Sequence, residues 1–450
     1  MVKSHIEESL GANPGDAALN PADSVAMGVQ SARAPRFLAS SRGRAFRALA
    51  HRPFRLLFVS FLINQTGFWI SHVSLQGLMV EITGNDPLQL GVLFFALFIP
   101  AFLLAPIAGV VADRFDRKRI MLACYAGVAL VMGALVALSL AGTVQAGHML
   151  VLAFLLGCCF CFSGPASMAV AANAVPDLDL PSAVSLQSAA NNLTRVLGPA
   201  LAAPLVATSH FEIAFGLFLA TSLVAAYLTA RMRIAAYLPE AEENGILGRL
   251  RTGLAHARER RPALPALLTV GALSFFGVSH VAVLPVYAEA VLGRPELFAW
   301  IVAASGVGAM IGALVTGYEA QASLRSSAVR MLLYGVSLAV FAWTTSLWVA
   351  LGAQVCVGYF YFAVMTSLQT LIQQVVDEGK RGRVMSLFQV AWAGLIPFGG
   401  FAMGGLANLT GIVPTLAVAS LACVAVAVYV ITGADRWSLP RAPAPAPAPR

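Results

Sequence analysis

The sequence contains few charged residues. Only 11% of its 450 residues are Asp, Glu, Lys or Arg, whereas a soluble globular domain has about 25%. Hydrophobic residues make up 58% of the chain, and the mean hydropathy is +0.78. This composition excludes an ordinary soluble protein, and apolar runs of 18 or more residues are expected to span a membrane.

The patterns of several other functions are missing as well. No P-loop pattern Gly-x-x-x-x-Gly-Lys-Ser/Thr occurs, which argues against direct use of ATP. No catalytic constellation or metal-ligand cluster is visible, so we expect neither an enzyme nor a bound metal or other cofactor. The net charge of +8 is interpreted as a topology signal rather than a nucleic-acid surface. All six cysteines fall in apolar runs, where they are expected to act as small packing residues: Cys124, Cys158, Cys159, Cys161, Cys356 and Cys423.

Twelve apolar segments are long enough to cross a membrane, because about 20 residues match the hydrocarbon thickness. They are continuous rather than alternating, which favours helices over a β-barrel. The sequence therefore predicts an all-α membrane protein with twelve transmembrane helices. Their approximate limits are 56–81, 88–111, 120–140, 148–172, 183–208, 212–231, 264–289, 297–317, 329–345, 347–372, 384–407 and 413–432.

The distribution of Lys and Arg predicts the topology. Arg195 alone lies deep within a span and Arg294 alone in an outer loop, while the other Lys and Arg residues fall on one side. The positive-inside rule then places both termini in the cytoplasm. No cleavable signal peptide is recognisable at the N-terminus, and we expect a multi-pass protein of a bacterial inner (plasma) membrane.

The longest internal loop divides the spans six and six. Ser71-His72-Val73 in the first span is repeated as Ser279-His280-Val281 in the seventh, and Gly198 in the fifth span corresponds to Gly399 in the eleventh. Parallel six-helix repeats of this kind form two pseudo-symmetric bundles. The predicted domains are a disordered cytoplasmic arm at 1–50, a bundle at 51–231, a cytoplasmic central loop at 232–262, a bundle at 263–433 and an Ala-Pro cytoplasmic tail at 434–450.

The strongest local motif lies between the second and third spans, and reads Gly109-Val-Val-Ala-Asp113-Arg114-Phe-Asp116-Arg117-Lys118-Arg119. It resembles the signature loop of the major facilitator superfamily, Gly-x-x-x-Asp-Arg-x-Gly-Arg-Lys/Arg, with Asp116 at the second Gly. Further segments resemble the branch that contains enterobactin exporters and "transmembrane secretion effector" relatives. They include Arg52-Pro-Phe-Arg55, Ile82-Thr-Gly84, Asn192-Leu-Thr-Arg195-Val-Leu-Gly198-Pro199, Leu284-Pro285 and Arg381-Gly382-Arg383. The resemblance covers about residues 52–432.

The resemblance implies a secondary active transporter that works by alternating access. The leading interpretation is proton-coupled efflux of a siderophore-like or drug-like small molecule by a monomer in the lipid bilayer, with no nucleic-acid partner, although the resemblance does not give the substrate. The resemblance also places the signature loop beside the eleventh span, and the predicted gating residues are Gly109, Asp113, Arg114, Arg117 and Arg383. Two departures leave the direction of transport open. The second-half copy near Gly317 lacks the Asp-Arg core, and Ala202-Ala203 follow Gly198-Pro199 where a Gly pair often stands.

Arg195 is the first candidate for substrate contact, since a charge deep in a span is costly and tends to mark function. Gln187, Asn191 and Arg195 are spaced four residues apart and share one helix face, which we expect to line a central cavity. There Arg195 could meet an anionic group of the substrate or of a neighbouring helix. The alternative is a structural arginine bound to backbone carbonyls between helices.

The first span carries a second polar stripe, formed by Gln65, Trp69, His72 and Gln76. His280 occupies the equivalent place in the seventh span, so we expect His72 and His280 to face one cavity and either carry a proton or bind polar substrate. The alternative is that each histidine is satisfied by nearby hydroxyls. Trp392 and Gln369 are further cavity candidates, because aromatic residues suit a bulky ligand, although packing explains them equally well.

Two other functions remain open at this point. One is transport of a lipid or metabolite, and the other is a ligand sensor with the same fold that transports nothing. The intact signature loop argues against the sensor.

Overall fold

The computed structural model describes residues 46–233, 254–260, 262–316 and 322–437. The predicted arm up to residue 45, most of the central loop, the loop copy at 317–321 and the tail from 438 lie outside these ranges. The chain from Phe46 onward forms one compact unit. Residues 47–50, which the sequence assigned to the arm, form a short 3₁₀-helix, η3 (Arg47–Ala50), whose Ala48 is buried and donates its N–H to Ser182 Oγ at 3.2 Å.

Helices occupy all twelve predicted places. In the first half they are α2 (Arg52–Thr83), α3 (Pro87–Arg114), α4 (Arg117–Leu140), α5 (Ala146–Asn173), α6 (Leu180–Ala207), which follows η4 (Asp177–Asp179), and α7 (Phe211–Ala230). In the second half they are α9 (Ala263–Ala272) continuing to α10 (Leu284–Ala290), α11 (Phe298–Thr316) after η7 (Pro295–Leu297), α12 (Leu324–Trp343), α13 (Leu347–Val375), α14 (Glu378–Gln389) continuing to α15 (Ile396–Thr410), and α16 (Ile412–Trp437).

Eleven of these segments, within the described residues, are long and apolar enough to cross a membrane. The twelfth, α6, has 28 residues, and it falls short in hydropathy because Gln187, Asn191, Asn192 and Arg195 interrupt its apolar sequence. Its length is sufficient, since 28 residues extend about 42 Å as a helix. The prediction of an all-α, two-bundle membrane fold is confirmed, with α6 as its most polar helix.

Aspartates define the start of two helices in the first half. Asp86 precedes Pro87 and accepts the Leu88 N–H at 2.8 Å, which caps α3. Asp116 accepts the N–H groups of Lys118 and Arg119 and caps α4. The substitution of Asp for the second Gly of the signature loop therefore provides an N-cap, which is among the best residue types for that position.

Two spans change helix type along their length. The seventh passes from α9 through a π-helix, η5 (Leu273–Gly277), and a 3₁₀-helix, η6 (Val278–Val283), before α10. The eleventh contains a π-helix, η8 (Val390–Gly394), between α14 and α15. Such interruptions often mark hinges or functional sites. The sequence predicted spans at 264–289 and 384–407 but not the change of helix type within them.

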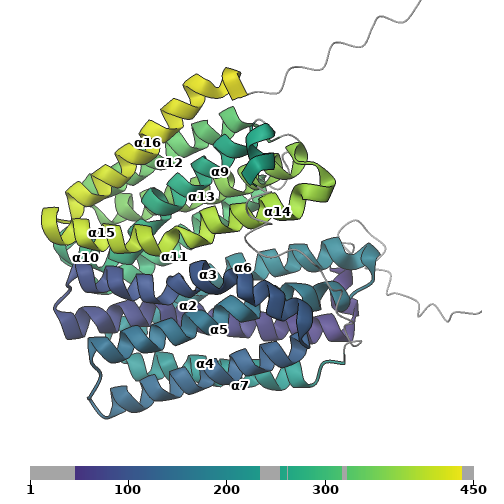
Figure 1. Ribbon diagram of the computed structural model, residues 1–450. Coiled ribbons are helices and arrows are strands. Elements are labelled where there is room, and N and C mark those ends of the chain that lie inside the picture. The colour runs from purple at the N-terminus through teal and green to yellow at the C-terminus, as the bar shows by residue number, and fades with distance from the viewer. Residues whose placement is uncertain (1–45, 234–253, 261, 317–321, 438–450) are drawn as a thin grey trace, which may run out of the picture. The chain divides into compact units, whose positions relative to one another are not determined.

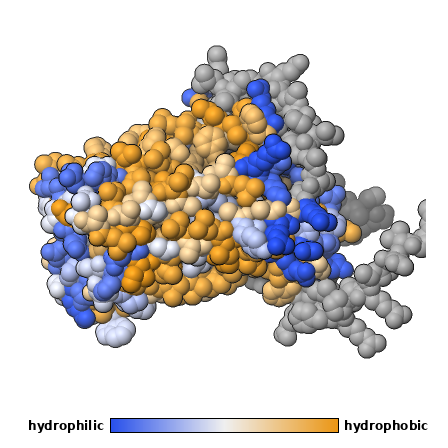
Figure 2. Space-filling model, turned by 90° about the horizontal axis from the view of Figure 1, so that it is seen from below, coloured by the Kyte–Doolittle hydropathy of each residue, from blue (hydrophilic) through white to orange (hydrophobic). Residues whose placement is uncertain are grey.

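The two halves meet where α3 packs on α15 and α6 packs on α11. We call the face that holds the start of α2 and the end of α16 the termini side, and the opposite face the far side (Figure 1). Surface hydropathy suits a bilayer, because a broad hydrophobic band separates two hydrophilic ends on the face shown in Figure 2.

Glycines bring the halves together on the far side. A Cβ on Gly91 of α3 would lie 2.9 Å from the carbonyl oxygen of Gly400 and 3.0 Å from Cα of Gly404, both in the eleventh span. Small residues at such crossings allow the backbones to approach closely. Hydrogen bonds add to the closure: Gln76 Nε2 donates to the Val281 carbonyl at 3.2 Å, and Asn85 Nδ2 donates to the Glu289 carboxylate.

The termini side is arranged differently. There α14 packs mainly on α9 and α13 of its own half, and its ribbon lies apart from the last turns of α3 (Figure 1). A Cβ on Gly109 in α3 would meet no atom within 4 Å. The described halves therefore have close backbone contacts on the far side, whereas the ribbons of α3 and α14 lie apart on the termini side (Figure 1).

Candidate functional site

Arg195 lies where the two halves meet. Its guanidinium carbon lies over two aromatic rings, 4.9 Å from the ring centroid of Trp69 in α2 and 4.8 Å from that of Phe362 in α13. Cation–π contacts of this kind are worth up to about 2 kcal/mol when desolvated. Within the described residues its side chain has no hydrogen-bonded carbonyl or carboxylate, and its Nε is buried without an acceptor. The described residues therefore do not support the alternative of an arginine bound to backbone carbonyls.

Close packing of the backbones fixes this position. A Cβ on Gly198 would lie 3.1 Å from Cα of Trp69, so the glycine three residues after Arg195 lets α2 and α6 touch. A Cβ on Gly306 of α11 would lie 2.6 Å from the carbonyl oxygen of Arg195. Because glycines allow both close contacts, the backbone at Arg195 lies between α2 of its own half and α11 of the other half.

The polar stripes of α2 and α6 are in contact. Gln65 Nε2 donates to Asn191 Oδ1 at 3.3 Å, one helical turn before Trp69 and Arg195 on their respective helices. Gln187, two turns from Arg195, has a buried Nε2 without an acceptor. Three of the predicted cavity residues therefore lie on one side of α6, with Gln65 opposite them.

The second half contributes an aromatic pair to the same region. Trp392 in η8 donates its Nε1–H to the Tyr361 hydroxyl at 2.6 Å, and Tyr361 is close enough to Arg195 for the two to interact electrostatically. Nothing in the sequence distinguishes Tyr361 from the other aromatic residues of α13. Gln369 is exposed on α13 and makes no hydrogen bond to the described residues, so it is not brought to Arg195 in this conformation.

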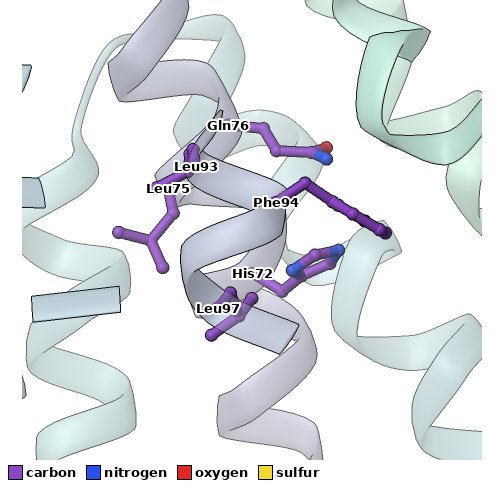
Figure 3. A pocket seen from close by; sticks show the side chains of 6 residues that line it. All are labelled: His72, Leu75, Gln76, Leu93, Phe94 and Leu97. Carbon is purple, nitrogen blue, oxygen red and sulfur yellow. The ribbon is translucent and has the colours of Figure 1, made fainter. Parts of the chain in front are cut away.

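His72 and Gln76 line a small cavity between α2 and α3 together with four apolar side chains (Figure 3). Both side chains are 3% exposed. The His72 ring packs against the rings of Phe68, Trp69, Phe94 and Phe98 at centroid distances of 5.8, 5.6, 6.1 and 5.9 Å. All four rings belong to the first half, so His72 lies within its own bundle.

His280 likewise turns into its own half. Its Nδ1 lies 2.7 Å from the Gly277 carbonyl and its Nε2 lies 3.2 Å from Gln354 Nε2. Because α13 supplies Gln354, the imidazole points away from the first half. The expectation that His72 and His280 face one shared cavity is wrong for this conformation, because each ring is buried within its own bundle. His280 has hydrogen-bond partners in its own half, whereas His72 packs on aromatic rings and its Nδ1 has no partner among the described residues.

The predicted gating residues are found at the ends of α3, α4 and α14. Arg114 is exposed, Arg117 Nε donates to the Ala112 carbonyl at 3.3 Å, and Arg383 is half-buried. Asp113 lies in the last turn of α3, and its side chain is outside the described part. The eleventh span begins at Glu378 rather than near Arg383, so the start of this helix was placed too late in the sequence.

The start of α14 forms ion pairs with residues that were not among the predicted site residues. Asp377 accepts two hydrogen bonds from Arg260 Nη2, at 2.7 and 2.9 Å. His256, which is 2% exposed, lies 3.4 Å from the same carboxylate. This ion-pair cluster ties the described end of the central loop to the eleventh span. In the sequence, Arg260 counted only among the Lys and Arg residues that predict the topology.

The cluster predicts a pH dependence. Hydrogen bonds from Arg260 hold the pKa of the Asp377 carboxyl below its usual value, which is about 3.9 in a free side chain. A depressed pKa stabilises the fold above the unfolded-state value and loses that contribution as the pH falls through the folded value. Asp377→Asn is therefore expected to cause a small decrease in melting temperature at pH 7 that shrinks below about pH 4 and disappears once the pH is below the lowered pKa of the carboxyl. An equal decrease at both pH values would contradict the assignment.

The geometry defines a class of protein: a multi-pass α-helical membrane protein built from two six-helix halves around a central arginine. The sequence model of the family described as transmembrane secretion effector matches residues 44–443. The chain belongs to this family of major facilitator superfamily transporters. It is a transporter and not an enzyme, and no metal-binding group of His, Cys, Asp or Glu occurs in the described ranges.

Curated relatives and solved structures agree with this assignment. The chain is 27% identical to the uncharacterized MFS-type transporter YfiS of Bacillus subtilis (84% of this chain, 91% of that protein). It is 23% identical to the staphyloferrin A transporter of Staphylococcus aureus (84% and 96%), and 25% identical to the multidrug efflux pump Tap of Mycolicibacterium fortuitum (82% and 92%). The fold is similar to the nucleoside transporter NupG, with a TM-score of 0.66 at 15% identity over 85% of this chain and 99% of that one. It is also similar to a bacterial homologue of the lysosomal transporter Spinster, with a TM-score of 0.65 at 16% identity over 90% and 100%.

Proposed function

We propose that the protein is a proton-coupled exporter of a siderophore-like or drug-like small molecule, which acts as a monomer in a bacterial inner membrane. The names of the staphyloferrin A transporter and of the multidrug efflux pump Tap support these two substrate classes. The termini side is the cytoplasmic side in this proposal, since most Lys and Arg residues lie there.

One observation carries the proposal. The halves are closed by glycine contacts at Gly91 and Gly404 on the far side, and α3 and α14 lie apart on the termini side. This is the arrangement expected of a carrier that is open to the cytoplasm, with Arg195 at the depth where the halves touch. Substrate would then be taken from the cytoplasm and released when the contacts on the far side open.

Flux measurements test this function directly. The purified protein is reconstituted in proteoliposomes loaded with pyranine, and an imposed proton gradient drives transport of ethidium or of the iron-free siderophore staphyloferrin A. Substrate movement against its own gradient, together with proton flux in the opposite direction, is expected. Binding without any flux would favour the alternative of a ligand sensor, and flux independent of the proton gradient would contradict proton coupling.

Asp113 provides a second test. When the termini side closes, the end of α3 has to approach the start of α14, and a carboxylate near a helix N-terminus is stabilised by about 0.3–1 kcal/mol. Asp113→Asn is therefore expected to disfavour the outward-open state and to reduce flux several-fold. Substitution of the neighbouring exposed Arg119, as Arg119→Gln, is the control and is expected to transport normally. Wild-type flux in Asp113→Asn would contradict the gating role.

A further inference from the structure

Two donors at the interface between the halves lack acceptors. The indole Nε1–H of Trp69 and the Nε–H of Arg195 are both buried, and neither has a hydrogen-bond partner in the described part of the chain. Buried donors are normally paired, because leaving one unpaired costs about 1–3 kcal/mol, and more for a charged group. The two residues are in contact, with the guanidinium carbon 4.9 Å from the Trp69 ring centroid.

Among the described residues, the groups around Arg195 include hydrogen-bond donors, and no carboxylate interacts with its charge. Trp69 and Arg195 can only donate hydrogen bonds. The Tyr361 hydroxyl accepts from Trp392 at 2.6 Å, which leaves its own proton available for donation. Gln65 Nε2 is already bound to Asn191. A ligand group that completes this cluster must therefore bring acceptor oxygens and negative charge.

We infer that Trp69 Nε1 and Arg195 Nε form a two-donor site for a carboxylate group of the substrate. The inference rests on the proposed function and adds a substrate chemistry and a second binding residue, Trp69. The carboxylate supplies the acceptors that the two donors lack, beside the two rings that contact the guanidinium. Phe362 comes from the second half, so a ligand bound by the two donors also contacts the surface that separates when the far side opens.

Trp69→Phe separates the hydrogen bond from the stacking. Phenylalanine keeps an aromatic ring for Arg195 and removes the N–H. The probe is radiolabelled salicylate, an aromatic carboxylate, with its uncharged amide salicylamide as the competitor. We expect the wild-type protein to bind salicylate without competition from salicylamide. Trp69→Phe is expected to weaken salicylate binding about tenfold, since one hydrogen bond to a charged group is lost.

Two variants control the experiment. Trp343→Phe changes a tryptophan in α12 that is 64% exposed, and it is expected to bind salicylate like wild type. Trp69→His restores a ring N–H and is expected to recover part of the lost affinity, which a purely structural role of Trp69 does not predict. Melting temperatures of all variants identify any that fail to fold.

Three results overturn the inference: no salicylate binding by the wild-type protein, equal competition by salicylamide, or wild-type affinity in folded Trp69→Phe. These outcomes are separate from failure of the proposed function. Carboxylate binding with no flux in proteoliposomes refutes export and leaves the site intact, whereas flux with Trp69-independent binding refutes the site and leaves export intact.

Discussion

Arg195→Ala is expected to abolish substrate binding and flux while leaving folded protein in the membrane. The guanidinium is the charge that a substrate anion meets, and truncating one partner of a buried charge pair costs about 2–5 kcal/mol. Affinity for an anionic substrate should therefore decrease by about 30-fold or more. Arg195→Lys keeps the charge but loses the planar group that stacks on both rings, so partial activity is expected.

The measurement has to separate binding from folding. Membrane abundance and melting temperature are recorded for each variant beside substrate affinity and initial flux. Loss of Arg195 also removes its stacking on Trp69 and Phe362, so a modest decrease in stability is compatible with the binding role. Normal affinity in folded Arg195→Ala would show that the arginine only connects the two halves.

Gly404→Leu is expected to hold the far side open and to stop transport. A Cβ at Gly404 would lie 2.8 Å from Cα and 3.0 Å from the N of Gly91, and both are backbone atoms of the other half that cannot move aside independently. Overpacking of this kind costs about 1–3 kcal/mol, which lowers the population of the far-side-closed state by roughly 5- to 150-fold. Flux should decrease in proportion, because every cycle passes through that state.

The next residue offers a matched control. Gly405 lies on the same helix, and a Cβ there would meet no atom within 4 Å, so Gly405→Leu is expected to transport normally. The readout is labelling of a cysteine placed at the buried Gln76 by an impermeant thiol reagent added outside, in a background with the exposed Cys356 changed to Ser. Gly404→Leu should increase the labelling rate and Gly405→Leu should not. Equal labelling in both variants would contradict the gating role of Gly404.

The helical elements followed closely from the sequence, and the interruptions did not. Apolar runs predicted helices at all twelve places, since hydropathy is a local property. The π-helices η5 and η8 and the early start of α14 depend on how a span packs against its neighbours. Hydropathy has no signal for these features, because a π-helix uses the same apolar residues as an α-helix.

The candidate site was predicted in part. Arg195 and the stripe with Gln187 and Asn191 could be found because a charged or polar face in an apolar helix is visible in the sequence. The contact of Gln65 with Asn191 was not predicted, because the sequence does not show which helices are neighbours. The role of Phe362 and the pairing of Trp392 with Tyr361 could not be found, because these aromatic residues are ordinary in an apolar helix until another helix brings a cation or a hydroxyl beside them.

The sequence by itself determined that the protein is membrane-embedded, all-helical and built from two related halves, because these properties follow from composition, apolar run length and repetition. Only the tertiary structure decided which side of the bundle is closed, that His72 and His280 turn into separate bundles, and that Trp69 and Phe362 enclose Arg195. Side-chain direction and the contact between halves depend on long-range packing, and in a chain this apolar most helix faces look alike until the neighbouring helix is known.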